Sequence, residues 1–209
     1  MDDIGGIWRT VGGRRIFIKK GQDLATAMKE SGKFSRNGLG ASNKYTEENH
    51  PKPKRLGKIE DLSEENIIKT LKNYEKKIIN DKIENAIVIT EVGEIYQCFG
   101  NEDNVWPNLD LGDKINGGYI THNHPKSKDG NDSFSFSDAD TSLFKNNNIK
   151  VLRGVDYKYQ YEINSSKKPV LKQPSWMDEM EDDSTYYHLK SIKFAIDNDI
   201  YYMRWKNVK

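Results

Sequence analysis

A short, wholly apolar segment places the strongest limit on the fold of this chain. Residues 86–89 read Ala-Ile-Val-Ile within the run 85–90. Such a run, bounded by polar residues, is typical of a strand that is buried on both faces and therefore needs cover on both sides of its sheet. Residues 63–80, just before it, predict one covering helix, because Ser63 suits an N-cap and apolar residues follow at helical spacing. These are Ile67, Ile68, Leu71, Tyr74, Ile78 and Ile79.

The elements that follow predict an α/β (α+β) fold, with a mixed sheet flanked by helices. Turn residues separate short apolar segments throughout this part of the chain. We expect strands over 94–99 and 117–122, a helix over 138–145 capped by Ser137, and a hairpin of 150–153 with 157–163 around Gly154.

Composition divides the chain into three parts. Only 35% of its 209 residues are hydrophobic, against an average of about 45–50% that also counts Gly, so we expect a modest core with long polar segments. The predicted parts are a basic, Gly-rich arm over 1–57, a folded domain over 58–172, and an acidic linker with a C-terminal helix over 173–209. Within them we expect a strand over 14–19, helices over 22–31 and 183–196, and a final aromatic tail that packs on the last helix.

Charge and cysteine content exclude several classes of protein. The formal net charge is +1, so bulk charge indicates neither nucleic acid nor membrane as a partner. Cys98 is alone, which rules out a disulfide framework and a cysteine-based zinc site. No apolar run approaches the roughly 18 residues of a membrane span. We therefore expect a cytoplasmic protein.

One cluster of residues carries the chemistry. His122 and His124 are one residue apart, and Asp140 follows at short range. In an extended segment residues i and i+2 point to the same side, so both imidazoles can reach one ion. Two histidines, one carboxylate and an open fourth position are the pattern of a hydrolytic zinc site. The sequence therefore predicts a metallohydrolase that also needs a carboxylate outside the metal ligands to move protons.

This pattern resembles a known motif. His122-x-His124-Pro125 followed by Ser137-x-x-Asp140 resembles the JAMM motif of JAB/MPN metalloproteases, and the His-Asn-His-Pro form is similar to the RadC-like branch. The resemblance extends over about residues 58–163. It implies a cytidine-deaminase-like JAB/MPN fold and hydrolysis of a peptide or isopeptide bond in a protein substrate. It also implies that His122, His124 and Asp140 bind zinc, that a Glu is the general acid/base, and that Ser137 stabilises the tetrahedral intermediate.

Two assignments within the motif have alternatives. Glu84 is the preferred general base because it directly precedes the first strand, as the Glu does in the RadC-like branch, while Glu91 and Glu94 remain alternatives. The spacer 126–136 is longer than is usual in that family, and it leaves a second Ser-x-x-Asp frame that ends at Asp138. We prefer the frame that ends at Asp140, because Phe-Ser-x-x-Asp is common in this branch and Ser137 suits an N-cap.

A second resemblance lies in the N-terminal arm. Residues 6–19 and 27–34 resemble a segment of tailed-phage minor head (head morphogenesis) proteins of Gram-positive hosts. It implies a phage or prophage origin and, through the arm, association with head or portal proteins in the infected host or the virion. It also leaves two alternatives to catalysis, a JAB-like binding protein of the phage head and a toxin-like effector delivered with it. An HNH nuclease is disfavoured, because that motif spreads over a much longer segment.

Overall fold

The computed structural model describes residues 6–11, 14–19, 50–126, 134–169 and 183–207. The chain forms two compact units, residues 1–44 and 45–209. In the first, β1 (Gly6–Val11) and β2 (Arg14–Lys19) pair antiparallel, with Trp8 opposite Phe17. The strand expected over 14–19 is confirmed, whereas the helix expected over 22–31 lies outside the described residues.

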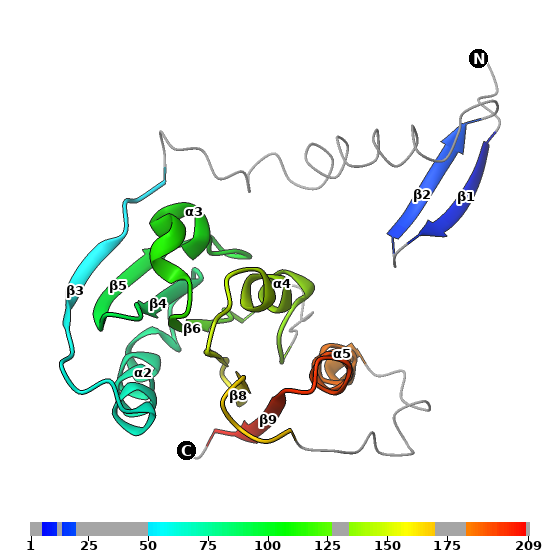
Figure 1. The fold of residues 1–209 in the computed structure, drawn as a ribbon. Coiled ribbons are helices and arrows are strands. Elements are labelled where there is room, and N and C mark those ends of the chain that lie inside the picture. The colour runs from blue at the N-terminus through cyan, green and yellow to red at the C-terminus, as the bar shows by residue number, and fades with distance from the viewer. Residues whose placement is uncertain (1–5, 12–13, 20–49, 127–133, 170–182, 208–209) are drawn as a thin grey trace. The chain divides into compact units, whose positions relative to one another are not determined.

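The second unit is built on a seven-stranded mixed sheet with the order β3-β5-β4-β6-β7-β8-β9 (Figure 1). Its strands are β3 (Lys54–Lys58), β4 (Asn85–Ile89), β5 (Glu94–Phe99), β6 (Tyr119–Asn123), β7 (Val151–Val155), β8 (Tyr159–Asn164) and β9 (Tyr201–Lys206). Strands β6 and β7 are parallel, and the other neighbours are antiparallel. The mixed sheet flanked by helices confirms the predicted α/β (α+β) class.

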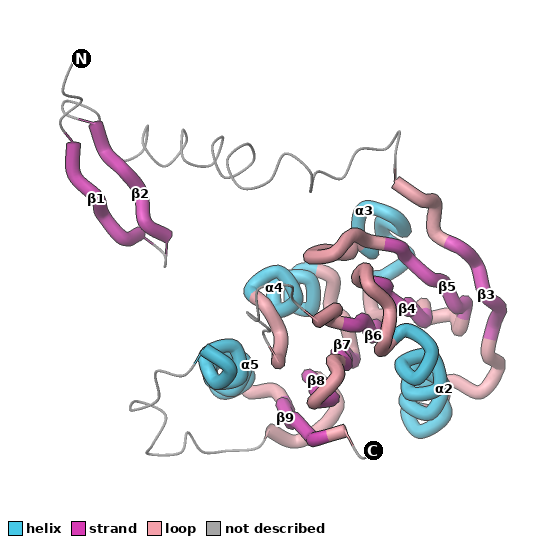
Figure 2. Tube along the Cα trace, turned by 180° about the vertical axis from the view of Figure 1, so that it is seen from behind, coloured by secondary structure: helices cyan, strands magenta, loops and turns pink. Residues whose placement is uncertain are grey.

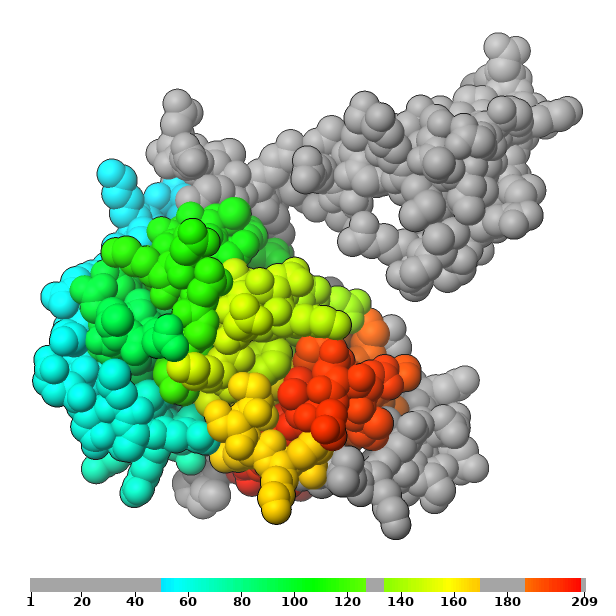
Figure 3. Space-filling view, viewed as in Figure 1, coloured from blue at the N-terminus to red at the C-terminus, as the bar shows by residue number. Residues whose placement is uncertain are grey.

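Helices cover both faces of this sheet. Helix α2 (Glu64–Ile78) lies on one face, as Figures 1 and 2 show. On the other face lie α3 (Pro107–Leu111), the 3-10 helix η1 (Gly112–Ile115), α4 (Asp138–Asn146) and α5 (Asp183–Asp197). Figure 3 shows α4 and the described part of α5 side by side, where Phe144 and Phe194 meet edge to face. None of the described helices is long and apolar enough to cross a membrane.

The core explains why the apolar run forms the central strand. All five residues of β4 are buried. Ile87 and Ile89 pack against α2, while Ala86 and Val88 face the cluster on the other side of the sheet. Alternate residues of a strand point to opposite faces, so a strand covered on both sides is apolar in successive positions, as residues 86–89 are, while the buried Asn85 at its start is hydrogen-bonded. The expected buried strand is confirmed.

The caps predicted from the sequence also form. The Ser63 hydroxyl accepts a hydrogen bond from the Asn66 amide at 3.4 Å at the start of α2. Ser137 and Asp140 form a reciprocal capping box at the start of α4. Both helices begin within a residue of the predicted position, because caps of this kind depend only on residues close in sequence.

The expected hairpin forms, but its turn is not at Gly154. Gly154 lies inside β7 opposite Tyr161, and a Cβ there would be 2.1 Å from the tyrosine ring. The turn instead follows Asp156, whose carboxylate accepts hydrogen bonds from the Lys158 and Tyr159 amides at 2.6 and 2.8 Å. Glycine is therefore needed for close packing at this position and not for chain reversal.

Both edges of the sheet differ from expectation. Lys54–Lys58, assigned to the arm, forms the edge strand β3 although it lacks apolar alternation. The aromatic tail forms β9 on the opposite edge. Of its aromatic residues, Tyr202 is buried toward α5, while Trp205 lies over Arg153 with the guanidinium carbon 6.0 Å from the ring centroid. The tail is therefore a strand of the sheet and only partly a packing surface for the last helix.

Candidate metal centre

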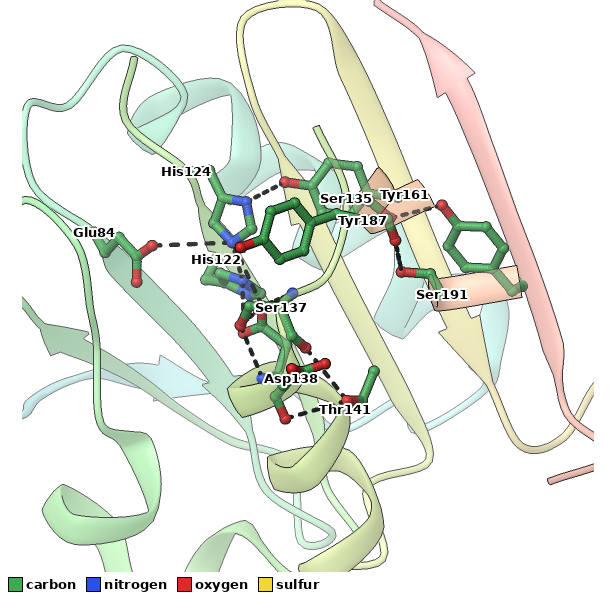
Figure 4. Close-up of polar contacts among 12 residues, drawn as sticks. Glu84, His122, His124, Ser135, Ser137, Asp138, Thr141, Tyr161, Tyr187 and Ser191 are labelled. Carbon is green, nitrogen blue, oxygen red and sulfur yellow. Dashed lines mark hydrogen bonds and ion pairs between the residues drawn. The ribbon is translucent and has the colours of Figure 1, made fainter. Parts of the chain in front are cut away.

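The two motif histidines lie where β6 ends. His122 belongs to β6, and the His124 amide donates to the Val155 carbonyl at 2.9 Å, which continues the pairing with β7 past the end of the strand. The extended backbone turns both imidazoles to the α4 side (Figure 4). Their Nε2 atoms are 2.9 Å apart. The side chain of His122 is 3% exposed and that of His124 is 12% exposed.

Asp140 completes the cluster from the first turn of α4. Its carboxylate oxygens lie 3.1 Å from His122 Nε2 and 3.6 Å from His124 Nε2. One donor atom from each of the three residues lies within 4.8 Å of the other two, so the group could hold a metal ion. Two imidazole nitrogens and one carboxylate oxygen form a donor set suited to divalent first-row metals.

The two Ser-x-x-Asp frames have different surroundings. The Asp138 side chain is 79% exposed and pairs with Lys190 at 2.7 Å. Ser135 is fully buried, and its hydroxyl is 2.8 Å from both the Ser191 and the Tyr202 hydroxyls. In the frame that starts at Ser135, the serine is therefore in the core and Asp138 is in solvent. In the frame that starts at Ser137, Asp140 lies beside the histidines.

Ser137 holds the Asp140 carboxylate. Its amide and its hydroxyl both donate to Asp140 Oδ2 at 2.7 Å, and the Asp140 amide donates back to the Ser137 hydroxyl at 3.2 Å. Both residues line a cavity of about 510 Å³, together with Glu84, His124 and Tyr187 of α5. The capping box thus fixes the third donor and leaves the serine hydroxyl beside the cavity.

Among the candidate general bases, the structure brings only Glu84 to the histidines. Its Oε1 lies 3.9 Å from His124 Nε2, and its side chain is 12% exposed. Glu91 is 65% exposed and pairs with Lys150. Glu94 accepts hydrogen bonds from Arg55 and from the Tyr96 hydroxyl. Burial raises the pKa of Glu84 to about 7, although the two histidines oppose this shift.

Asn123, between the two histidines, brackets Glu84. Its side-chain oxygen accepts from the Asn85 amide at 2.8 Å, and its side-chain nitrogen donates to the Ile83 carbonyl at 3.0 Å. Asn123 is fully buried. Because these two bonds hold the residues on either side of Glu84, they fix that carboxylate relative to the strand that carries the histidines.

Tyr161 of β8 orients His124 from the other side. Its hydroxyl lies 2.7 Å from His124 Nδ1. A neutral imidazole that binds a metal through Nε2 carries its proton on Nδ1 and needs an acceptor there. The tyrosine oxygen can act as that acceptor, so this contact is compatible with the tautomer that presents Nε2 to the cluster. The Tyr161 ring reaches this place by packing on Gly154.

The cluster is strongly coupled electrostatically. Burial would lower the pKa of His124, but its hydrogen bond to Asp140 and the charge of Glu84 outweigh burial and raise the pKa to about 9. Burial would raise the pKa of Asp140, but the two histidines hold it well below its usual value. Without a metal, the site is therefore an ion pair, and a bound cation would replace the histidine proton.

Comparison with known proteins adds no family to this picture. No protein-family model matches the chain, and no curated protein or solved structure is detectably similar to it. The JAB/MPN and phage-head resemblances therefore remain predictions, and the functional argument depends on the geometry of the cluster.

Proposed function

We propose that the protein is a zinc-dependent hydrolase of amide bonds, of the JAMM type. One observation carries this proposal: a buried carboxylate, Glu84, lies 3.9 Å from a His-His-Asp group that could hold a metal ion. A structural metal site uses all its positions for protein ligands, whereas a catalytic site keeps one open and has a proton acceptor beside it. Three donors with a neighbouring carboxylate fit the second description.

Each residue has a separate role in the proposed reaction. When bound by His122, His124 and Asp140, zinc supplies Lewis acidity and lowers the pKa of a water toward about 7. Glu84 takes a proton from the attacking water and returns it to the nitrogen of the leaving amine. Burial raises the pKa of Glu84 to about 7 in the metal-free site, and the charge of a bound zinc ion would lower it from there. The Ser137 hydroxyl would turn its single proton from Asp140 Oδ2 toward the developing oxyanion.

The proposed substrate is a peptide or isopeptide bond in a protein. The phage-head resemblance of residues 6–19 adds head or portal proteins as proposed partners, and it is independent of the catalytic residues. An inactive JAB-like binding protein remains the alternative that shares the same metal site.

A Glu84→Gln variant tests the catalytic proposal. Glutamine keeps the size of the side chain but cannot accept the proton, so we expect zinc to stay bound while hydrolysis falls about a hundredfold or more. The measurement is cleavage of a peptide library prepared from a digested proteome, with and without isopeptide-linked members, read by mass spectrometry as new termini.

Glu91→Gln is the matched control, because Glu91 is exposed and pairs with Lys150 instead of contacting the histidines. It should cleave like the wild type. Equal cleavage by Glu84→Gln would place the base elsewhere. A zinc-loaded wild type that cleaves no member of the library would contradict the hydrolase and support the binding protein.

A further inference from the structure

A groove lies on the sheet face opposite the metal centre. Among the described helices, α2 alone packs on this face, over β4 and β6, and one helix is too narrow to cover seven strands. Beside it a groove of about 930 Å³ remains, bordered by α2 on one side and by residues of β7, β8 and the chain after them on the other. We call it the α2 groove.

Two of the residues that border the α2 groove, Glu75 and Lys167, belong to a network of paired charges. Arg153 is fully buried and donates to Glu75 at 2.6 Å and to Glu162 at 2.5 Å. Lys167 at the border donates to Glu162 at 2.7 Å. Because these groups neutralise one another, the charge that a ligand meets comes from the rim.

The rim formed by α2 is acidic at the first turn, with Glu64 and Glu65, and basic beyond it. Lys69, Lys72 and Lys76 are exposed and border the groove. Their spacing of three and four residues places them on one face of the helix. In the part of the chain that the structure describes, no ion pair involves any of the three. The walls between them include apolar side chains, Ile68 and Ile79 of this helix region and Val155 of β7.

The α2 groove leads toward the metal centre. Ile79 borders both this groove and a second one of about 780 Å³, which residues 79–82, Pro125 and His124 line. His124 in turn lines the cavity that contains Glu84 and Asp140. Neighbouring cavities that share wall residues therefore lie between the lysine rim and the cluster.

We propose that the α2 groove binds an extended, acidic segment of a polypeptide, and that this polypeptide is the substrate. The claim that this polypeptide is the substrate depends on the proposed function, whereas the claim that the groove binds an acidic segment does not. Three unpaired ammonium groups select negative charge, and apolar walls accept the side chains between acidic residues. A polypeptide fits better than a nucleic acid, because a peptide can place uncharged residues beside Glu64 and Glu65 at one end of the groove, whereas a nucleic acid carries a phosphate at every nucleotide.

The test is a binding measurement that needs no catalysis. The probe is a short fluorescein-labelled peptide with alternating Glu and Val, titrated with metal-free wild-type protein and followed by fluorescence anisotropy. The variant K69Q/K72Q/K76Q removes the rim charges. K77Q/K145Q/K193Q is the matched control, because it removes the same charge from exposed lysines outside the groove.

We expect the rim variant to bind the acidic peptide about tenfold more weakly than the wild type, and the control to bind within about twofold of it. An equal loss of peptide affinity in both variants would contradict binding in the α2 groove. So would a wild type that does not bind the peptide. Tighter binding of a single-stranded oligonucleotide that is lost in the same rim variant would overturn the choice of a polypeptide. Because the protein is free of metal, each result is independent of whether it hydrolyses anything.

Discussion

The place of the proton on the His124 imidazole involves a residue outside the motif. The Tyr161 hydroxyl lies 2.7 Å from Nδ1, where its oxygen can accept the proton that a metal-binding imidazole carries there. Tyr161→Phe removes this acceptor and keeps the ring that packs on Gly154. We expect zinc affinity to fall about tenfold to a hundredfold, measured by competition with a chromophoric chelator.

Tyr159→Phe is the control for this prediction, since Tyr159 lies in the same strand and stacks on Phe134 rather than on the histidines. Its affinity should match the wild type. If Tyr161→Phe also binds zinc like the wild type, the tyrosine does not set the tautomer.

Residues whose role depends on local geometry could be predicted from the sequence, and the others could not. The pair of histidines follows from strand alternation, and Ser137 with Asp140 follows from a capping box. Tyr161 depends on the register between β7 and β8, and on a glycine whose place inside the strand no local pattern indicates. In the sequence, Asn123 only distinguishes the His-Asn-His-Pro form of the motif. Its structural role could not be predicted, because its hydrogen-bond partners lie about forty residues away.

At the scale of elements, the proposed catalytic arrangement depends on how β6 holds the start of β4. Asn123→Ala breaks both bonds that bracket Glu84 and leaves the Asn85 amide and the Ile83 carbonyl without this partner. We expect stability to fall by about 1–3 kcal/mol. The turnover number should fall while zinc affinity stays unchanged, because the metal ligands keep their own contacts.

The measurements are the melting temperature, the zinc affinity, and the kcat and KM values on a peptide that the wild type cleaves. Asn116→Ala, in an exposed turn, is the control. A folded Asn123→Ala protein with wild-type kcat would show that Asn123 supports the fold alone.

Elements with strong local signals formed as expected, and those set by tertiary contacts did not. Helices α2 and α4 have caps and apolar periodicity, and β4 has an apolar run. Strands β3 and β9 lack such signals. They are strands because β5 and β8 offer free edges, which a single sequence does not reveal.

At the scale of the whole molecule, the two faces of the sheet carry different groups. The candidate metal centre lies on the α4 side, and the buried ion network of Arg153, Glu75 and Glu162 lies on the α2 side. Arg153→Met leaves the buried Glu75 without its cation and leaves Glu162 with Lys167 alone, so we expect the free energy of unfolding to fall by about 3–5 kcal/mol. Urea unfolding followed by circular dichroism measures this change.

Arg55→Met is the control, because its pair with Glu94 is half exposed and should contribute less than about 1 kcal/mol. The folded fraction of Arg153→Met should bind zinc like the wild type. Wild-type stability in this variant would mean that the network does not join α2 to the sheet.

Zinc titration by calorimetry tests the central claim most directly, applied to the wild type, His122→Ala, Asp140→Ala and Asp138→Ala at neutral pH. We predict one zinc ion per wild-type chain, loss of binding in His122→Ala and Asp140→Ala, and unchanged binding in Asp138→Ala, whose carboxylate is exposed and pairs with Lys190. A wild type that binds no zinc, or an Asp140→Ala variant that binds it as tightly as the wild type, would contradict the proposed metal centre.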